Sequence, residues 1–344
     1  MIDFLIVGGG IAGINFAWQA EQHQYSYHLI DPFLFNSSTA VAAGLINPVT
    51  GRKFATQWNM ETLIPLAEKT YTELENFTGS TFFYRHPIIK IHKNESIVEE
   101  WIKIQSSTSI SPYINVSPNL SKYARYLDFR YGAIGVSPGF RLNTAELITA
   151  FKNRVADKII TGNFDYNVLK INAGNFEYNN NSYKNIIFCE GVATQQNPWF
   201  NFIAFKPAKG ECLIIEIPNY ETNEIIIKGI ILIPLGNNKF WVGATNTWND
   251  LSNTPTEAGR AELENGLQQL LKLPYTLLAH KAAVRPSIRD RTPVVGQQPE
   301  IANMYVLNGL GTKGTSLAPY YAKQLFEHII NGSAINKEVA VNRF

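Results

Sequence analysis

The stretch IDFLIVGGGIAG (residues 2–13) decides the fold. It starts as a short, almost wholly apolar run and ends in glycines, which predicts a buried strand followed by a tight turn. INFAWQAEQ (14–22) then has helical spacing of apolar residues, and SYHLID (26–31) predicts a second strand. A strand, a glycine turn, a helix and a strand in this order begin a parallel, doubly wound α/β sheet.

The glycines have the spacing G-x-G-x-x-G of a dinucleotide-binding turn. Gly8 permits the turn, Gly10 lets a pyrophosphate approach the backbone, and Gly13 allows the helix to pack closely on the strand. The helix start offers N–H groups and a positive dipole end to phosphate. An acidic residue at the end of the next strand suits the ribose hydroxyls. The candidate cofactor residues here are Gly8, Gly10, Ile11, Ala12, Gly13 and Asp31. The alternative is a glycine-rich turn without a ligand, and the motif alone does not separate NAD from FAD.

Length and composition narrow the class of protein. The 344 residues suggest about two domains. Thirty basic and 28 acidic residues give a net charge of +2, which makes a nucleic-acid partner unlikely. Two cysteines without CxxC spacing, and no export or membrane-spanning segment, favour a cytoplasmic protein that does not contact membranes. Six histidines without metal-ligand spacing give no metal site.

The rest of the chain predicts a discontinuous nucleotide domain interrupted by a second sheet. Apolar spacing predicts helices over 59–77, 143–156, 257–273 and 315–330. Alternating residues over 210–245 predict antiparallel strands, and 94–135 reads as irregular and polar. We expect an FAD- or NAD-binding domain over 1–80, 136–204 and 282–344, and a β-rich substrate domain over 81–135 and 205–281.

Five segments carry a resemblance to a known family. They are VGGGIAG (7–13), STAVAAGLINPVTGRKF (38–54), IIFCEG (186–191), AAVRPSIRDRTPVVG (282–296) and NGLGTKGTSLAP (308–319). In these segments the chain resembles the FAD-dependent D-amino-acid oxidase and glycine oxidase superfamily. The resemblance implies FAD as the cofactor and an α/β FAD-binding domain beside an antiparallel substrate domain. No cysteine follows Cys212, so the covalent link of some relatives is excluded and a noncovalent FAD is expected.

The resemblance assigns the substrate carboxylate to Arg285. A planar guanidinium holds a carboxylate through two parallel charge-assisted hydrogen bonds. The alternative is a structural ion pair of this arginine with Asp290 or Glu300. The resemblance also implies that Asn47 faces the flavin ring and that Arg52 adds positive charge near the substrate. Asn47 reads equally well as a turn residue before Pro48.

Other positions are implied as FAD contacts. The loop before the last helix would pass the pyrimidine side of the flavin, and the helix start would favour negative charge there. Lys313 reads equally well as a solvated lysine. The strand FDYNVLKIN (164–172) would contact adenine, or its valine would be a core residue. The implied contacts are Ala43, Gly44, Val168, Gly191, Gly309, Gly311, Lys313, Gly314 and Thr315. Cys189 and Glu190 depart from the small residues usual in the family, and Tyr220, Trp241 and Trp248 are candidate pocket walls or core aromatics.

The expected activity is oxidation of an amine, an amino acid or an N-substituted glycine, by hydride transfer to FAD, with oxygen or another electron acceptor. The alternative is the tRNA wobble-uridine modification carried out by a related FAD module on a carboxymethylaminomethyl group. A third interpretation is a nucleotide-binding protein that uses FAD structurally, without turnover.

Overall fold

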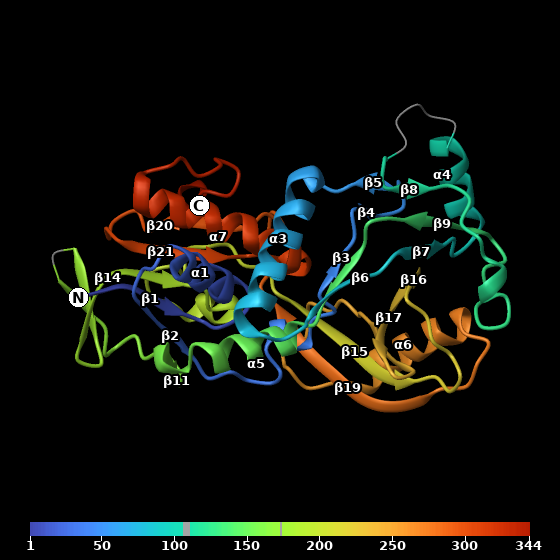
Figure 1. The fold of residues 1–344 in the computed structure, drawn as a ribbon, viewed down its shortest axis with the longest axis horizontal. Coiled ribbons are helices and arrows are strands. Elements are labelled where there is room, and N and C mark those ends of the chain that lie inside the picture. The colour runs from blue at the N-terminus through green and yellow to red at the C-terminus, as the bar shows by residue number, and fades with distance from the viewer. Residues whose placement is uncertain (106–110, 173) are drawn as a thin grey trace.

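The computed structural model describes residues 1–105, 111–172 and 174–344. Two eight-stranded sheets lie in two halves of the molecule, and both chain termini belong to the half built on the first sheet (Figure 1). The first sheet is mostly parallel and the second is mostly antiparallel. The predicted pairing of a Rossmann-like domain with a β-rich domain is therefore confirmed. The predicted domain boundaries stay a prediction.

The first sheet has a parallel centre. Its parallel strands are β11 (Ile159–Thr161), β2 (Tyr27–Asp31), β1 (Ile2–Val7), β14 (Asn181–Phe188) and β21 (Met304–Asn308). Its antiparallel strands are β12 (Lys170–Asn172), β13 (Asn175–Tyr178) and β20 (Val294–Gln297). Phe4, Leu5 and Ile6 of β1 have no exposed surface. A strand that is covered on both faces needs such a continuous apolar run.

The second sheet carries the other half of the molecule. Its order is β19 (Thr276–Arg285), β15 (Ala208–Glu216), β18 (Lys239–Gly243), β17 (Ile230–Gly236), β16 (Ile225–Lys228), β7 (Ile88–Ile91), β9 (Ala133–Val136) and β8 (Ile114–Asn115). Only β16 and β7 pair in parallel among these strands. There are two further small sheets: β3 (Leu45–Ile46), β10 (Phe140–Leu142) and β6 (Phe83–Arg85), and the hairpin of β4 (Val49–Thr50) and β5 (Ala55–Thr56).

The helices are α1 (Ile11–Gln22), α2 (Ser38–Val41), α3 (Met60–Thr78), α4 (Glu95–Gln105), α5 (Thr144–Arg154), α6 (Glu257–Leu270) and α7 (Gly314–Asn331). Helices α1 and α7 pack together on the first sheet, where Phe16 and Phe326 lie 6.0 Å apart between ring centroids (Figure 1). Asn143 caps α5, because its side chain accepts from the Glu146 N–H, as its place before the predicted helix suggests. Among the described residues, every helix is too short or too polar to cross a membrane.

The prediction of an irregular segment over 94–135 is wrong in part. The segment contains α4, β8 and most of β9, and residues 106–110 lie outside the described residues. Helix α4 buries a single side chain, Trp101, which packs edge-on against Phe54 at 5.1 Å. Ile97 and Ile104 are partly buried beside Trp101, so apolar residues do recur at helical spacing in α4, and this signal could have identified the helix.

Candidate active site

The glycine turn between β1 and α1 is closely packed. Gly8 has φ +106°, and a Cβ there would overlap the carbonyl oxygen of Cys189. A Cβ on Gly13 would overlap the carbonyl oxygen of Gly8, so this glycine lets α1 lie against the turn. Gly10 is the N-cap of α1 and has no side chain to cap it, although Thr39 Oγ1 accepts from the Ile11 N–H at 3.0 Å. The backbone therefore forms an open rim at a helix N-terminus.

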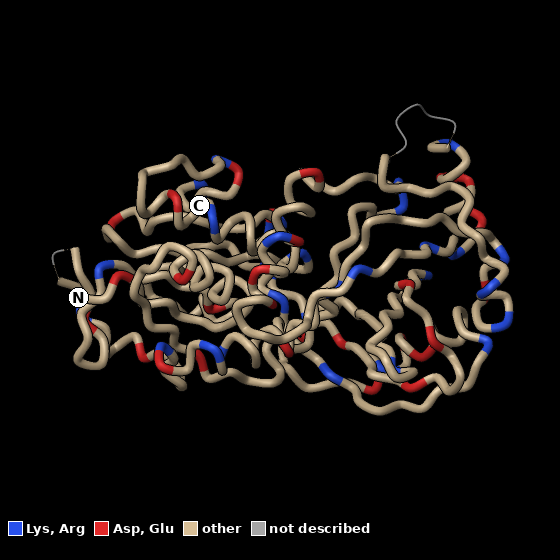
Figure 2. The backbone as a smooth tube through the Cα atoms, in the orientation of Figure 1, with Lys and Arg blue, Asp and Glu red and all other residues tan. Residues whose placement is uncertain are grey.

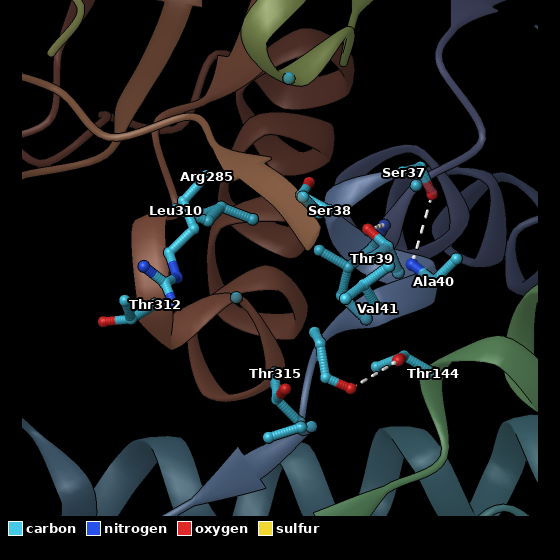
Figure 3. A pocket seen from close by; sticks show the side chains of 18 of the residues that line it. Ser37, Ser38, Thr39, Ala40, Val41, Thr144, Arg285, Leu310, Thr312 and Thr315 are labelled. Atoms are coloured by element: carbon cyan, nitrogen blue, oxygen red, sulfur yellow. Dashed lines mark hydrogen bonds between the residues drawn. The ribbon is translucent and has the colours of Figure 1, made fainter. Parts of the chain in front are cut away.

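A cavity of about 870 Å³ starts at this rim and runs between the two large sheets. In the view of Figure 3, Ser38, Thr39 and Val41 lie on one side of the cavity, and Arg285, Leu310 and Thr312 lie on the other. Most of the predicted site residues line it: Gly8, Gly10, Ile11, Ala12, Asp31, Ala43, Gly44, Asn47, Gly191, Arg285, Gly311, Lys313, Gly314 and Thr315.

Four predicted residues lie outside the cavity lining: Gly13, Arg52, Val168 and Gly309. Arg52 is exposed between β4 and β5. Val168 is 41% exposed. Only the last three residues of the strand predicted over 164–172 form a strand, β12, so Val168 lies before it. Val168 is therefore not the core valine that the alternative interpretation expected. Gly309 has φ +73° and packs against Ile288 under the loop.

Asp31 lies at the glycine turn, where the motif predicts it. Its Oδ2 accepts from the Gly9 N–H at 2.6 Å, and its Oδ1 accepts from the Phe33 N–H. Burial raises the pKa of this carboxyl group. Lys152 of α5 lies nearby, with its Nζ 4.4 Å from the centre of the Phe33 ring. This end of the cavity holds one carboxylate and one ammonium group.

A second helix N-terminus lies beside the first at the cavity. The loop after β21 leads into α7 at Gly314, where a Cβ would lie 3.1 Å from the Cγ2 of Ile11. No side chain caps this helix start. The Thr315 carbonyl oxygen accepts from the buried Tyr71 hydroxyl at 2.7 Å, which fixes the helix start. Burial lowers the pKa of Lys313. Two helix N-termini favour a negatively charged group between them.

Asn47 lies in the cavity wall, but its side chain takes part in a turn. Its Oδ1 accepts from the Val49 N–H at 3.0 Å, and its carbonyl oxygen accepts from Gln57 Nε2. These bonds fix the segment between β3 and β4. The side-chain oxygen thus has the local role that the turn interpretation expects.

Arg285 ends β19 and turns its guanidinium into the cavity (Figure 3). Nη1 donates to Asn246 Oδ1 and Nη2 donates to the Thr245 carbonyl oxygen, both at 3.1 Å. Among the described residues no carboxylate pairs with it. Asp290 binds Arg343 instead, at 3.0 Å. Burial lowers the pKa of Arg285, so a partly buried cation without a carboxylate partner lines the cavity.

Several cavity residues were not predicted. Thr39 accepts from the Ile11 N–H through Oγ1 at 3.0 Å. Glu190 is held by the Tyr166 hydroxyl at 2.6 Å and by Asn197 Nδ2 at 2.9 Å, and burial raises its pKa to about 7. Gly210 lies beneath Arg285. A glycine inside a strand often marks a close approach of other atoms, and that signal could have identified Gly210.

The three aromatic candidates have different positions. Trp241 lines the cavity, where its Nε1 donates to the Val41 carbonyl oxygen at 3.2 Å. Tyr220 is buried away from it and stacks on Phe240 at 5.4 Å. Trp248 is 51% exposed and lies outside the lining.

The cavity suits a flavin dinucleotide. Gly10 presents backbone and no side chain at the cavity rim, and two helix starts whose N-cap residues make no side-chain hydrogen bond supply N–H groups and positive dipole ends. Asp31 at the first end can accept hydrogen bonds from a ribose, and the volume continues to the second sheet. The residues present therefore fit the group that the turn predicts.

Comparison with known proteins defines the class. Residues 3–328 match the family model described as FAD dependent oxidoreductase, the DAO family. The chain belongs to this family, and it is an FAD-dependent enzyme of the oxidoreductase class.

Particular relatives agree with this assignment. The crystal structure of glycine oxidase from Geobacillus kaustophilus is 16% identical, with a TM-score of 0.81, and the match covers 99% of this chain and 98% of that one. Iminodiacetate oxidase from Chelativorans sp. BNC1 is 18% identical, with a TM-score of 0.78 and 98% of each chain covered. At these identities the two structures share the fold.

A curated relative matches over a shorter stretch. Glycine oxidase from Geobacillus kaustophilus (strain HTA426) is 27% identical over 124 residues, which is 33% of this chain. The match spans about a third of that relative's length (31%). The activity of the whole relative is therefore transferred only as a proposal.

Proposed function

We propose that this protein oxidises a small amine that carries a carboxylate, an amino acid or an N-substituted glycine. The observation that carries the proposal is Arg285, a cavity-lining cation whose hydrogen bonds go only to an amide oxygen and a backbone carbonyl among the described residues. The names of the glycine oxidase and iminodiacetate oxidase neighbours support the same class of substrate.

The roles of the chain's own residues follow from the cavity. Arg285 binds the substrate carboxylate through its planar fork and thereby orients the amine end of the molecule along the cavity. The hydrogen bonds to the Thr245 carbonyl oxygen and Asn246 Oδ1 fix the orientation of the guanidinium. Ile231, Trp241 and Cys212 form an apolar wall beside it, which keeps water from that side of the substrate.

FAD, when bound, supplies the acceptor for a hydride from the carbon next to the amine nitrogen, and water then hydrolyses the imine product. The cavity residues would hold its diphosphate at the glycine rim and its ring between the sheets. Gly13 and Gly309 were predicted as cofactor residues, and we propose packing roles for them, against the Gly8 carbonyl oxygen and Ile288. We propose no FAD or substrate contact for Arg52 or Val168, which lie outside the cavity lining. We propose oxygen as the electron acceptor.

The two cysteines, Cys189 and Cys212, are free and buried, which favours a cytoplasmic location.

Charge gives no support to the tRNA alternative. Lys and Arg are interspersed with Asp and Glu in both halves of the molecule, with more Lys and Arg at the outer edge of the second half (Figure 2), and the net charge is +2. A protein that binds a polyanion through many phosphates needs a basic face.

The test is anaerobic addition of single compounds to the purified yellow protein. Glycine, sarcosine, D-alanine and iminodiacetate are compared with tRNA carrying the modified wobble uridine. The proposal expects at least one of the small amino acids to bleach the flavin absorbance. Bleaching by the tRNA alone would support the alternative instead.

A further inference from the structure

Gly210 and Arg285 are in contact across two neighbouring strands. In the register of β15 with β19, Gly210 pairs with Ala283, and Arg285 pairs with Ala208 two residues away. The Arg285 side chain lies back over Gly210. A Cβ built on Gly210 would overlap Nη2 and Cζ and would lie 2.8 Å from Nη1. The guanidinium thus rests directly on the backbone of β15.

The other side of the guanidinium is fixed by the segment after β18. Thr245 and Asn246 accept its two hydrogen bonds at 3.1 Å. Thr245 is itself bound to β15, because the Glu211 N–H donates to its Oγ1 at 2.9 Å and its own N–H donates to the Glu211 carbonyl oxygen at 3.2 Å. Strand β15 therefore fixes the guanidinium from below, and through Thr245 it also fixes the acceptors beside it.

A second glycine of this sheet is also covered by a large side chain, in this case one from its own strand. Gly243 of β18 pairs with Cys212 of β15, and a Cβ on Gly243 would lie 2.5 Å from the ring of Trp241. The indole ring lies over Gly243 as the guanidinium lies over Gly210. At both glycines the absence of a Cβ lets a large cavity-lining side chain lie directly on the sheet backbone.

We propose that Gly210 is a positioning residue for substrate binding: the absence of its side chain sets the depth at which Arg285 holds the carboxylate. The proposal rests on the proposed function of Arg285. Gly210 has no left-handed φ, so the backbone accepts alanine there. The first consequence of an added Cβ is then a raised guanidinium, which loses its bonds to Thr245 and Asn246.

The test is Gly210→Ala, measured by the change of the flavin spectrum on titration with two unreactive monocarboxylates, acetate and benzoate. We expect a rise in Kd of about tenfold to a hundredfold, the cost of misplacing a binding group by about 1 Å, with unchanged FAD content. For the substrate found in the anaerobic panel, we expect KM to rise more than kcat falls. Gly135→Ala is the control, because Gly135 lies in β9 of the same sheet, away from the cavity, against Asn115.

A double variant separates positioning from general damage. If Gly210 acts through Arg285, then Gly210→Ala adds nothing to the Kd of Arg285→Ala. If Gly210→Ala alone does not fold, Gly210→Ala with Arg285→Ala should fold, since the overlapping group has been removed. Equal carboxylate affinities for wild type and Gly210→Ala, or a double variant that still does not fold, would overturn the inference. If neither acetate nor benzoate changes the flavin spectrum of the wild-type protein, both the proposed function and the inference are contradicted.

Discussion

Arg285 donates to Asn246 Oδ1 at 3.1 Å, and this neutral amide stands where a structural arginine usually has a carboxylate. The neighbouring acid on the same stretch of chain, Asp290, is bound to Arg343. Among the residues that the structure describes, no carboxylate pairs with the guanidinium, which lies at the wall of a large cavity. A ligand with a carboxylate would remove this imbalance.

Arg285→Ala should weaken the binding of a carboxylate substrate by about 2–5 kcal/mol, the range for loss of one partner of a desolvated charged hydrogen-bonded pair. FAD should stay bound, because the glycine rim is untouched. The measurement is kcat/KM together with the flavin content of the purified variant. Wild-type kinetics in this variant would remove Arg285 from the site.

Gly10→Val should give a folded protein without FAD. A side chain at Gly10 points to Thr39, whose Oγ1 would lie 3.0 Å from the new Cβ, and the valine methyl groups would fill the rim of the cavity. Flavin absorbance of the purified protein and its far-UV circular dichroism are the two measurements. Gly10→Ala, with one carbon, is the graded comparison and should retain more flavin. A fully yellow Gly10→Val protein contradicts the assignment of the rim.

Because Glu190 is buried, we expect the free energy of unfolding to fall as the pH rises. Burial raises its pKa from 4.5 to about 7, so the folded protein keeps a proton that the unfolded chain releases between these values. The stabilising contribution is complete below about pH 4.5 and is lost as the pH rises to about 7, a loss of about 3 kcal/mol. Glu190→Gln should flatten the dependence of the unfolding free energy on pH over this window. Glu177→Gln, at an exposed carboxylate, should keep the wild-type slope.

Replacing Lys209 should lower the free energy of unfolding substantially, because its buried ammonium group is ion-paired. Its side chain has no exposed surface, and its ammonium group binds Asp250, the Thr254 carbonyl oxygen and, at 3.6 Å, Glu211. Lys209→Met leaves Glu211 buried without this cation, which should cost about 3 kcal/mol of unfolding free energy. Urea denaturation measures the change. Lys184→Met removes an exposed partner of Asp3 and should alter the midpoint little. Equal effects of the two substitutions would contradict this account of Lys209.

The first half of the fold could be predicted because its signals are local. The apolar run of β1, the glycines after it and Asp31 all lie within one short stretch, and each has a single physical reason. In the segment 94–135, α4 was missed although Ile97, Trp101 and Ile104 recur at helical spacing, whereas the two-residue strand β8 is too short to show an alternating pattern.

In the candidate site, too, the residues with a local sequence signal could be predicted and those that depend on distant contacts could not. The glycine rim follows from spacing, whereas Arg285 could be selected only through resemblance, since nothing near it in sequence shows that Asp290 binds Arg343 instead. Gly210 and Glu190 depend on contacts between distant strands and loops. Val168 was predicted to lie within a strand, but that strand begins two residues later, at Lys170.

The most direct test compares pairs of amines that differ only in the carboxylate: glycine with methylamine, and sarcosine with dimethylamine. Each compound is added anaerobically to the yellow wild-type protein and to Arg285→Ala, and the rate of flavin bleaching is recorded. The account predicts that the wild type is bleached faster by the member of the reactive pair that carries the carboxylate, and that Arg285→Ala loses this preference. Equal rates within each pair for the wild type, or a preference that survives in Arg285→Ala, would contradict it.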